Sequence, residues 1–300
     1  MVKVNVCHER IERCLASPLR DCIIDNVNIK NFPHPSMSEY QYYWFEAIDK
    51  PLTVLQQEEL RAISTRAEID SRRFVNEYHF GSFKGNPLEL MKKYFDAHIY
   101  YACWATRVLM LKVPAKCIDL KLAKNYCTEH TFEIVESGDD LIFCFNIWIE
   151  CGEGWWQKNS EMEQLIALRD DILGGDYRCL YLAWLARRHD SNGFKDDGDP
   201  PPVPAGLRYL TEPLKVFAKF MFLEDADLNE AAKLSGDNAL KPPTSKELKD
   251  WVAALPEKVK HDTLLSLLEE KETPQTIHRV LLNRFLQDRK KAKPAKATKK

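Results

Sequence analysis

The sequence lacks the short motifs that most often identify a catalytic centre or a cofactor site. It contains no HExxH, no CxxC, no GxSxG or SxxK nucleophile motif and no Walker-type phosphate loop. Cys117, Cys127 and His130 lie near one another, but the nine residues between the two cysteines match no common zinc spacing. We therefore predict no bound cofactor and no metal site.

The nine cysteines follow no disulfide pattern, and no long hydrophobic run is present. Their number is odd and their spacings are irregular, whereas disulfide-rich secreted domains carry even numbers of cysteines. We therefore expect reduced thiols and a cytoplasmic protein. No stretch approaches about 18 uninterrupted apolar residues, so neither a membrane span nor a membrane partner is expected.

Positive charge is scarce outside the last twelve residues. Residues 289–300 carry seven Lys or Arg and no acid, which leaves 36 bases and 45 acids in residues 1–288, a net charge of −9. A dedicated nucleic-acid-binding protein needs a basic face that neutralises phosphates, so the acidic body argues against that class. The tail leaves one alternative open, which is salt-sensitive contact with nucleic acid through Lys290, Lys291 and Lys293.

The pattern that is present is typical of an α+β protein. A helix from Pro87 to about Ala105 is predicted from apolar residues at helical spacing, with Asn86 as its N-cap. Strands are predicted where aromatic and β-branched residues are dense, at 41–48, 66–80, 108–113 and in a hairpin formed by TFEIVES and LIFCFNIWIE. We expect a mixed or antiparallel sheet of about five strands with packed helices, followed by an all-helical C-terminal region.

Composition divides the chain into five parts. Prolines interrupt the first 38 residues, which are expected to be peripheral, with Met37 as an alternative start. The segment from Tyr177 to Arg188 is apolar nearly all round and is expected to be a helix buried against the sheet. The predicted domains are a peripheral N-terminal extension (1–38), an α+β core (39–190), an acidic connection rich in Pro and Gly (191–207), a helical region (208–287) and a disordered basic tail (288–300).

Two segments carry a family resemblance. One is YYWFEAIDKPL at 42–52, and the other is NEYHFGSFKGNPLELMKKYFDA at 76–97, followed by a Trp-x-Thr-Arg sequence. Over about residues 39–190 the chain resembles a family of uncharacterised bacterial proteins that share an aromatic strand ending in AID-basic-PL, the NEY and FKG loop, and the LMxxYFDA segment. The resemblance implies one folded unit and a bacterial source. It implies no activity, because none is assigned to that family.

Glu77, His79 and Asp96 are the candidate catalytic residues. On a strand, the spacing of Glu77 and His79 places both side chains on the same side. Asp96 and His98 could join them if the following helix packs beside that strand, and such a cluster would suit acid/base catalysis. The structural alternative is that His98 is a core residue with a satisfied hydrogen bond and that Glu77 pairs with a neighbouring arginine.

Lys84 and Arg107 are the candidate anion-binding residues. Lys84 lies in a loop between two glycines directly before a predicted helix, where backbone N–H groups favour anions. The alternative is that these glycines serve only the turn into the helix. Arg107 could bind a carboxylate, stack on an aromatic ring or form a salt bridge with Asp96.

Trp155 and Trp156 are the candidate partner-binding residues, because adjacent tryptophans are typical of a binding hot spot or of an anchor to the protein body. With no complete catalytic signature, we expect a cytoplasmic, non-catalytic interaction or accessory protein that binds a protein partner in a bacterial multi-component system. One alternative is a metal-dependent or acid/base hydrolase, such as a nuclease, with a site around Glu77, His79, Lys84, Asp96 and Arg107. A nucleic-acid-associated factor that uses the basic tail is the second alternative.

Overall fold

The structure, a computed structural model, describes residues 40–81, 83–149, 159–191, 199–236 and 244–269, together with five single positions between 277 and 288. The predicted N-terminal extension, the tail from Arg289 onward and the middle of the acidic connection lie outside these residues. So do five candidate site residues, Trp155, Trp156, Lys290, Lys291 and Lys293. No helix in the described part of the chain is long and apolar enough to cross a membrane.

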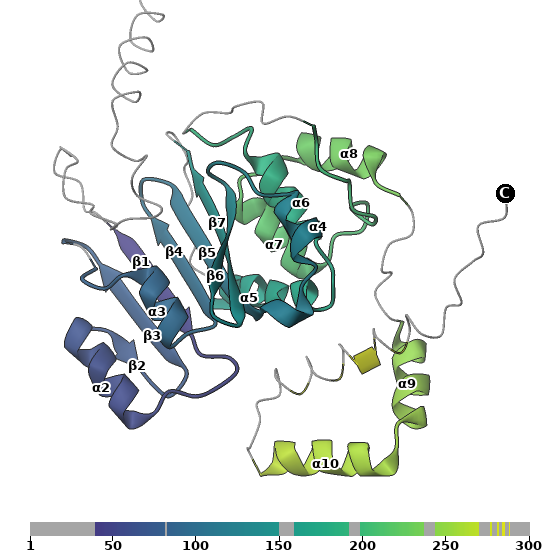
Figure 1. Ribbon diagram of the computed structural model, residues 1–300, viewed down its shortest axis with the longest axis horizontal. Coiled ribbons are helices and arrows are strands. Elements are labelled where there is room, and N and C mark those ends of the chain that lie inside the picture. Colours follow the sequence, from purple (N-terminus) through teal and green to yellow (C-terminus); the bar gives the residue numbers. More distant parts are fainter. Residues whose placement is uncertain are drawn as a thin grey trace, which may run out of the picture.

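A seven-stranded sheet forms the centre of the described fold (Figure 1). Its order is β2-β3-β1-β4-β5-β7-β6, and every neighbouring pair is antiparallel. The α+β class and the antiparallel sheet are therefore confirmed, whereas the number of strands exceeds the predicted five. The strands are β1 (Gln41–Glu46), β2 (Glu68–Ile69), β3 (Arg73–Tyr78), β4 (Ala97–Ala102), β5 (Thr106–Pro114), β6 (Phe132–Ser137) and β7 (Asp140–Trp148).

The predicted helix from Pro87 to Ala105 is wrong in its second half. Helix α3 covers only Pro87–Lys93, and β4 then runs between β1 and β5 in the middle of the sheet. All six residues of β4 are buried because both faces of a central strand are covered. A short run that is apolar on every side fits a helical face as well as a strand, so periodicity alone did not separate the two.

Helices cover both faces of the sheet. On one face lie α5 (Asn159–Leu173), α6 (Arg178–Ala186) and α7 (Glu212–Phe220), and on the other lie α2 (Val54–Ile63) and α3 (Figure 1). A short 3-10 helix (Ala115–Cys117) and α4 (Leu120–Lys124) connect β5 to β6. Each face of the sheet therefore has its own apolar cluster.

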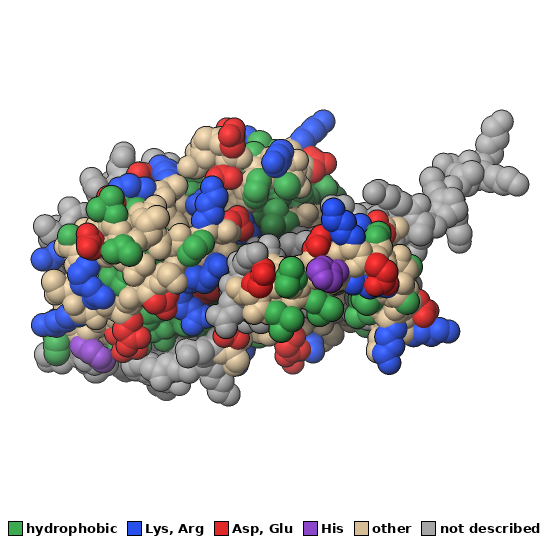
Figure 2. Space-filling model, turned by 90° about the horizontal axis from the view of Figure 1, so that it is seen from below, with side chains coloured by type: hydrophobic (Ala, Val, Ile, Leu, Met, Phe, Trp, Pro, Cys, Tyr) green, Lys and Arg blue, Asp and Glu red, His purple; other side chains and the backbone are tan. Residues whose placement is uncertain are grey.

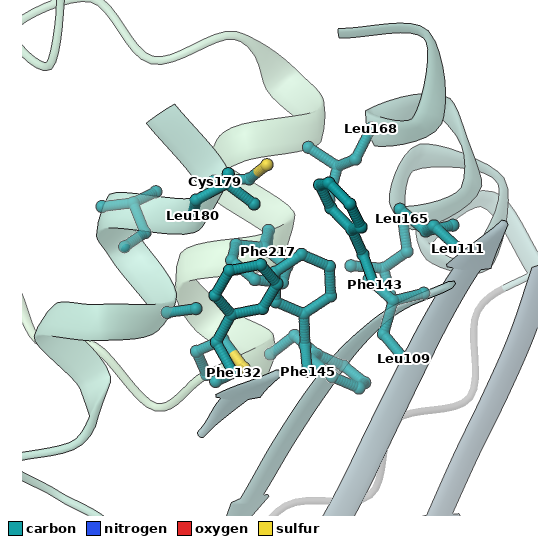
Figure 3. Packing of buried hydrophobic residues seen from close by; sticks show 14 of the residues in the cluster. Leu109, Leu111, Phe132, Phe143, Phe145, Leu165, Leu168, Cys179, Leu180 and Phe217 are labelled. Atoms are coloured by element: carbon teal, nitrogen blue, oxygen red, sulfur yellow. The ribbon is translucent and has the colours of Figure 1, made fainter. Parts of the chain in front are cut away.

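The larger cluster joins the sheet to α5, α6 and α7 (Figure 3). Phe217 of α7 meets Phe145 of β7 edge-on at a centroid distance of 5.1 Å, and Phe145 stacks on Phe132 of β6 at 4.9 Å. Every residue of α6 is buried, which confirms the prediction for the segment from Tyr177 to Arg188. Such aromatic pairs stabilise a core beyond the area that they bury.

This core continues past residue 190 into helices of the predicted helical region. Leu207, Leu214, Phe217 and Ala231 all belong to the larger cluster, and they come from the segment before α7, from α7 and from α8 (Asp225–Leu234). The last two described helices differ. Neither α9 (Ser245–Ala254) nor α10 (Glu257–Leu268) contributes a residue to either cluster, and Figure 1 shows both apart from the sheet.

Candidate functional site on one face of the sheet

The structure separates the predicted catalytic residues. Residues opposite each other on neighbouring antiparallel strands share a face, and Glu77 of β3 lies opposite Tyr42 of β1. His98 of β4 lies opposite Phe45, which is three residues after Tyr42 on β1. Because successive side chains of a strand point to opposite faces, His98 points to the face opposite that of Glu77. The convergence of Glu77 and His79 with Asp96 and His98 that the sequence left open does not occur.

Asp96 fixes the turn that follows β1. Its Oδ2 accepts hydrogen bonds from the backbone N–H groups of Ile48 at 2.8 Å and Asp49 at 2.9 Å. Its Oδ1 lies 3.2 Å from Nζ of Lys112, which also donates to the carbonyl of Met91. The alternative of a salt bridge between Asp96 and Arg107 is wrong, since Lys112 is the cation that contacts Asp96. These contacts tie the carboxyl group of Asp96 to the turn after β1 and to Lys112, so Asp96 has a structural role.

Asp49 and Arg169 extend this network to helix α5. Two guanidinium nitrogens of Arg169 reach the two carboxylate oxygens of Asp49, at 3.1 and 2.5 Å. The Nε of Arg169 donates to the carbonyl of Lys112 at 2.6 Å. Arg169 is almost fully buried, and a bidentate pair with further hydrogen bonds is the geometry that offsets the cost of burying a guanidinium. Asp49 belongs to the AID segment of the resemblance, whose role here is to anchor α5.

His98 is a neutral core histidine. Its ring lies 3.9 Å from the ring of Phe45 in a stacked arrangement, and its Nδ1 donates to the carbonyl of Trp44 at 3.0 Å. Burial lowers the pKa of His98 to about 3, against the opposing effect of that hydrogen bond. The structural alternative for His98 is therefore confirmed, and its ring stays neutral near neutral pH.

Four aromatic side chains lie next to one another on the Glu77 face of the sheet, and we term them the tyrosine shelf: Tyr40, Tyr42, Trp44 and Tyr101. Tyr42 stacks on Tyr101 at a centroid distance of 5.0 Å, and the ring of His79 lies 5.3 Å from that of Tyr40. Arg107 of β5 follows Tyr101 in the same cross-strand row. Glu77, His79 and Arg107 thus share this face, but Glu77 and Arg107 are three strand spacings apart, roughly 14 Å.

Glu46 and Arg73 form the other end of the tyrosine shelf, and the sequence did not identify them. The indole N–H of Trp44 donates to Glu46 at 3.1 Å, and the guanidinium of Arg73 lies 5.0 Å from the ring of Trp44. Burial raises the pKa of Glu46, against the opposing charge of Arg73, which lies 3.7 Å away. Glu46 continues the two-residue spacing of Tyr42 and Trp44 along β1, which is the only sequence signal for it.

The chemistry of the tyrosine shelf is that of packing and hydrogen bonding. Its four rings are only 3–8% exposed, and burial raises the pKa values of Tyr42 and Tyr101 far above the neutral range. Their hydroxyl groups therefore keep their protons and cannot serve as general bases. Glu77 and His79 form its exposed margin. Within the described residues, no three His, Cys, Asp or Glu side chains are placed to hold a metal ion.

Lys84 lies on the surface in the loop before α3. Asn86 accepts a hydrogen bond from the N–H of Glu89 and Pro87 occupies the first helical turn, as the sequence predicted. A Cβ atom at Gly85 would stand 2.7 Å from the ring of Phe83, which packs on Tyr43 at 4.8 Å. The packing of Phe83 therefore accounts for this glycine, and no anion site is needed to explain it.

Arg107 holds the C-terminal end of α7. Its guanidinium donates to the carbonyls of Lys219 at 3.0 Å and Phe220 at 3.1 Å, and it lies 3.6 Å from the ring centroid of Phe222. Cations at helix C-termini stabilise the exposed carbonyls. Burial lowers the pKa of Arg107 to about 10, so it keeps its charge at neutral pH. Of the predicted uses of Arg107, the structure shows stacking on an aromatic ring.

Phe222 has a φ of +53° where α7 ends, a position at which glycine is the usual residue. Substitutions of Phe222 therefore test how Arg107 holds this helix end. The N–H groups of Phe222 and Leu223 bond to the carbonyls of Lys219 and Ala218, which completes the helix end. Phe222→Ala keeps the backbone strain and loses the stack on Arg107, so we expect the free energy of unfolding to fall by about 1–2 kcal/mol. Phe222→Gly should recover about 1 kcal/mol of it. Urea unfolding measures both, and equal losses would contradict the account.

Helix α10 presents an apolar surface that the sequence analysis did not single out. Leu264 is 60% exposed and Leu268 is 79% exposed, and Leu265 and Leu267 lie beside them. No residue of α10 is buried. Half of the large apolar residues that are exposed in the described chain belong to α9 and α10, so this short region is the most concentrated candidate contact surface. The signal was the LLSLL run, whose environment depends on packing that a sequence does not reveal.

Comparison with known proteins finds no matching family model, no matching curated protein and no matching solved structure.

Proposed function

We propose that this chain is a cytoplasmic, non-catalytic interaction protein that binds a protein partner of a bacterial multi-component system through α9 and α10. The observation that supports it most is the leucine surface of α10, which lies outside both core clusters. Apolar helices derive most of their stability from packing of their apolar side. Docking on a partner would bury these leucines and supply that packing.

The charge around these leucines favours a protein partner. Residues 244–269 contain four Lys and five Asp or Glu, so this region has no excess of positive charge for phosphates or anionic lipids. Figure 2 likewise shows acidic and basic side chains interspersed over the described surface seen from below. An apolar surface with charges of both signs around it matches a partner that presents an apolar helix or groove with a mixed polar rim.

Two of the five residues proposed for a hydrolase site have structural partners, and packing explains the loop that carries a third. Asp96 holds the turn after β1, Arg107 holds the end of α7, and the loop of Lys84 is explained by the packing of Phe83. Glu77 and His79 remain on the exposed margin of the tyrosine shelf. A general base without a positioned nucleophile or oxyanion donor supports no specific reaction, so we propose no catalytic activity.

The docking proposal predicts that Leu264→Glu combined with Leu268→Glu strongly weakens partner binding. Two carboxylates in the centre of an apolar interface should weaken capture about 30-fold or more, the effect of losing a hot-spot residue. The measurement is recovery of the bound protein from cell extract by tagged full-length chain. Leu55→Glu is the matched control, since Leu55 is 66% exposed on α2 and far from α10 in sequence.

The outcomes of this experiment are separable. Loss of binding with the α10 double variant alone supports the proposal. Equal recovery with both variants contradicts it. A purified chain that forms only a dimer with itself, as judged by light scattering, also contradicts it, because the occupant would then be a second copy.

A further inference from the structure

A buried cluster of charged residues joins α5, α6 and the turn before α7. Arg178, at the start of α6, makes hydrogen bonds of 2.6–3.0 Å with the carboxylate of Asp176. Its other terminal nitrogen donates to the carbonyls of Gly206 and Tyr209, each at 3.0 Å. Arg178 therefore ties the loop between α5 and α6 to the 206–209 turn, and we term these contacts the Arg178 clamp.

The 206–209 turn also connects to α8. The N–H of Gly206 donates to the carbonyl of Gly236, and the N–H of Leu207 donates to the hydroxyl of Ser235, which follows α8. The segment before α7 is therefore attached both to Arg178 and to the residues that follow α8, and loosening the Arg178 clamp would weaken this attachment. Both carbonyls that Arg178 binds would lose a charged donor, and for the buried contact with Gly206 the loss of a donor is costly.

Asp171 is the residue in this cluster that the fold leaves unsatisfied. It lies in the last turn of α5, its backbone carbonyl accepts from the N–H of Asp176 at 2.8 Å, and its Oδ2 is buried. That oxygen has no hydrogen-bond partner among the residues that the structure describes. A buried carboxylate without donors is disfavoured, whereas a neutral carboxylic acid is tolerated.

We propose that Asp171 makes the Arg178 clamp sensitive to protons. When the carboxyl group of Asp171 loses its proton, the new negative charge repels the carboxylate of Asp176 and competes with it for Arg178. This competition weakens the hold of Arg178 on Gly206 and Tyr209 and loosens the entry into α7. When Asp171 is protonated, it does not compete with Asp176 for Arg178, and the Arg178 clamp is closed.

The charged and titratable groups that act on Asp171 fit this assignment. They are Asp170 on α5, Asp176 in the loop, and Arg178 and Cys179 on α6. Burial first, and then the charge of Asp176, raise the pKa of Asp171 to about 7, while Arg178 opposes the shift. Burial keeps the thiol of Cys179 protonated by raising its pKa. The folded chain therefore binds more protons than the unfolded chain between about pH 4 and 7, so stability falls as pH rises through that window.

Hydrogen exchange at pH 6 and pH 8 tests the proposal. In the wild-type full chain, the protection of amides 206–211, corrected for the intrinsic rate, should fall about tenfold between the two pH values, the equivalent of one pKa unit. Asp171→Asn should remove this change, while Glu163→Gln, an exposed acid on α5, should keep it. Strand β7 should stay more strongly protected than amides 206–211 at both pH values, which separates local loosening from global unfolding.

Three results would overturn it. One is a wild-type chain with equal protection at both pH values, and another is an Asp171→Asn chain with the wild-type pH response. The third is equal protection of β7 and amides 206–211, which would show that the turn opens only through global unfolding. Asp171→Ser serves as a second variant if Asp171→Asn does not fold, and the same outcomes apply to it.

Discussion

Asp96→Ala is expected to reduce the free energy of unfolding by about 3–5 kcal/mol, the cost of removing one partner from a buried ion pair. The substitution leaves Lys112 without its carboxylate and the N–H groups of Ile48 and Asp49 without their acceptor. Asp96→Asn should cost less, because an amide oxygen can still accept one of these hydrogen bonds. Urea unfolding followed by tryptophan fluorescence measures both losses.

Glu77→Ala is the control for Asp96→Ala, since Glu77 is an exposed residue of β3. It should change the free energy of unfolding by less than about 0.5 kcal/mol, as is usual at exposed positions. If Asp96→Ala is as stable as Glu77→Ala, the structural role of Asp96 is contradicted. The hydrolase alternative would then regain its strongest candidate residue.

Phe217→Ala is the second substitution with a large expected effect, a fall of about 3–5 kcal/mol in the free energy of unfolding. Its ring is fully buried and meets Phe145 edge-on in the larger cluster (Figure 3). Truncation would remove this contact and leave a cavity between α7 and the sheet. The measurement is again denaturant unfolding. The wild type and the variant are compared with the same dependence of the free energy of unfolding on denaturant concentration.

The contrast with an exposed residue makes the test of Phe217 specific. Leu55→Ala removes a side chain of similar size at the surface and should cost less than about 0.5 kcal/mol. A loss below about 1 kcal/mol for Phe217→Ala, which is an ordinary value for substitutions outside the core, would show that α7 is not part of the core. The helices after residue 207 would then form a separate unit, as the domain prediction from sequence placed them.

Local signals in the sequence were sufficient for several elements. Thr53 and Gln56 form a reciprocal cap of α2, and their spacing in the sequence is typical of such a cap. The hairpin of β6 and β7 turns at Gly138, whose φ of +62° explains the glycine. These features depend on residues within a few positions of one another, so sequence patterns identify them.

Features that depend on distant residues could not be predicted. Strand β4 is a strand because β1 and β5 pair with it on both sides, and its own pattern is equally apolar in all directions. The partner of Asp49 is Arg169, 120 positions further along the chain. Likewise Arg107 acts on carbonyls more than 100 positions away. Tertiary contacts of this kind override local propensity, and one sequence contains no measure of them.

The measurement that most directly tests partner binding is affinity purification of the full-length chain and of residues 1–288 from extract of the producing cells. Bound proteins are identified by mass spectrometry, and the ratio of absorbance at 260 and 280 nm reports nucleic acid. We predict that one protein co-purifies in stoichiometric amount with both forms and without nucleic acid. Recovery of both forms with neither protein nor nucleic acid would contradict partner binding, and nucleic acid bound to the full-length chain alone would favour the basic tail.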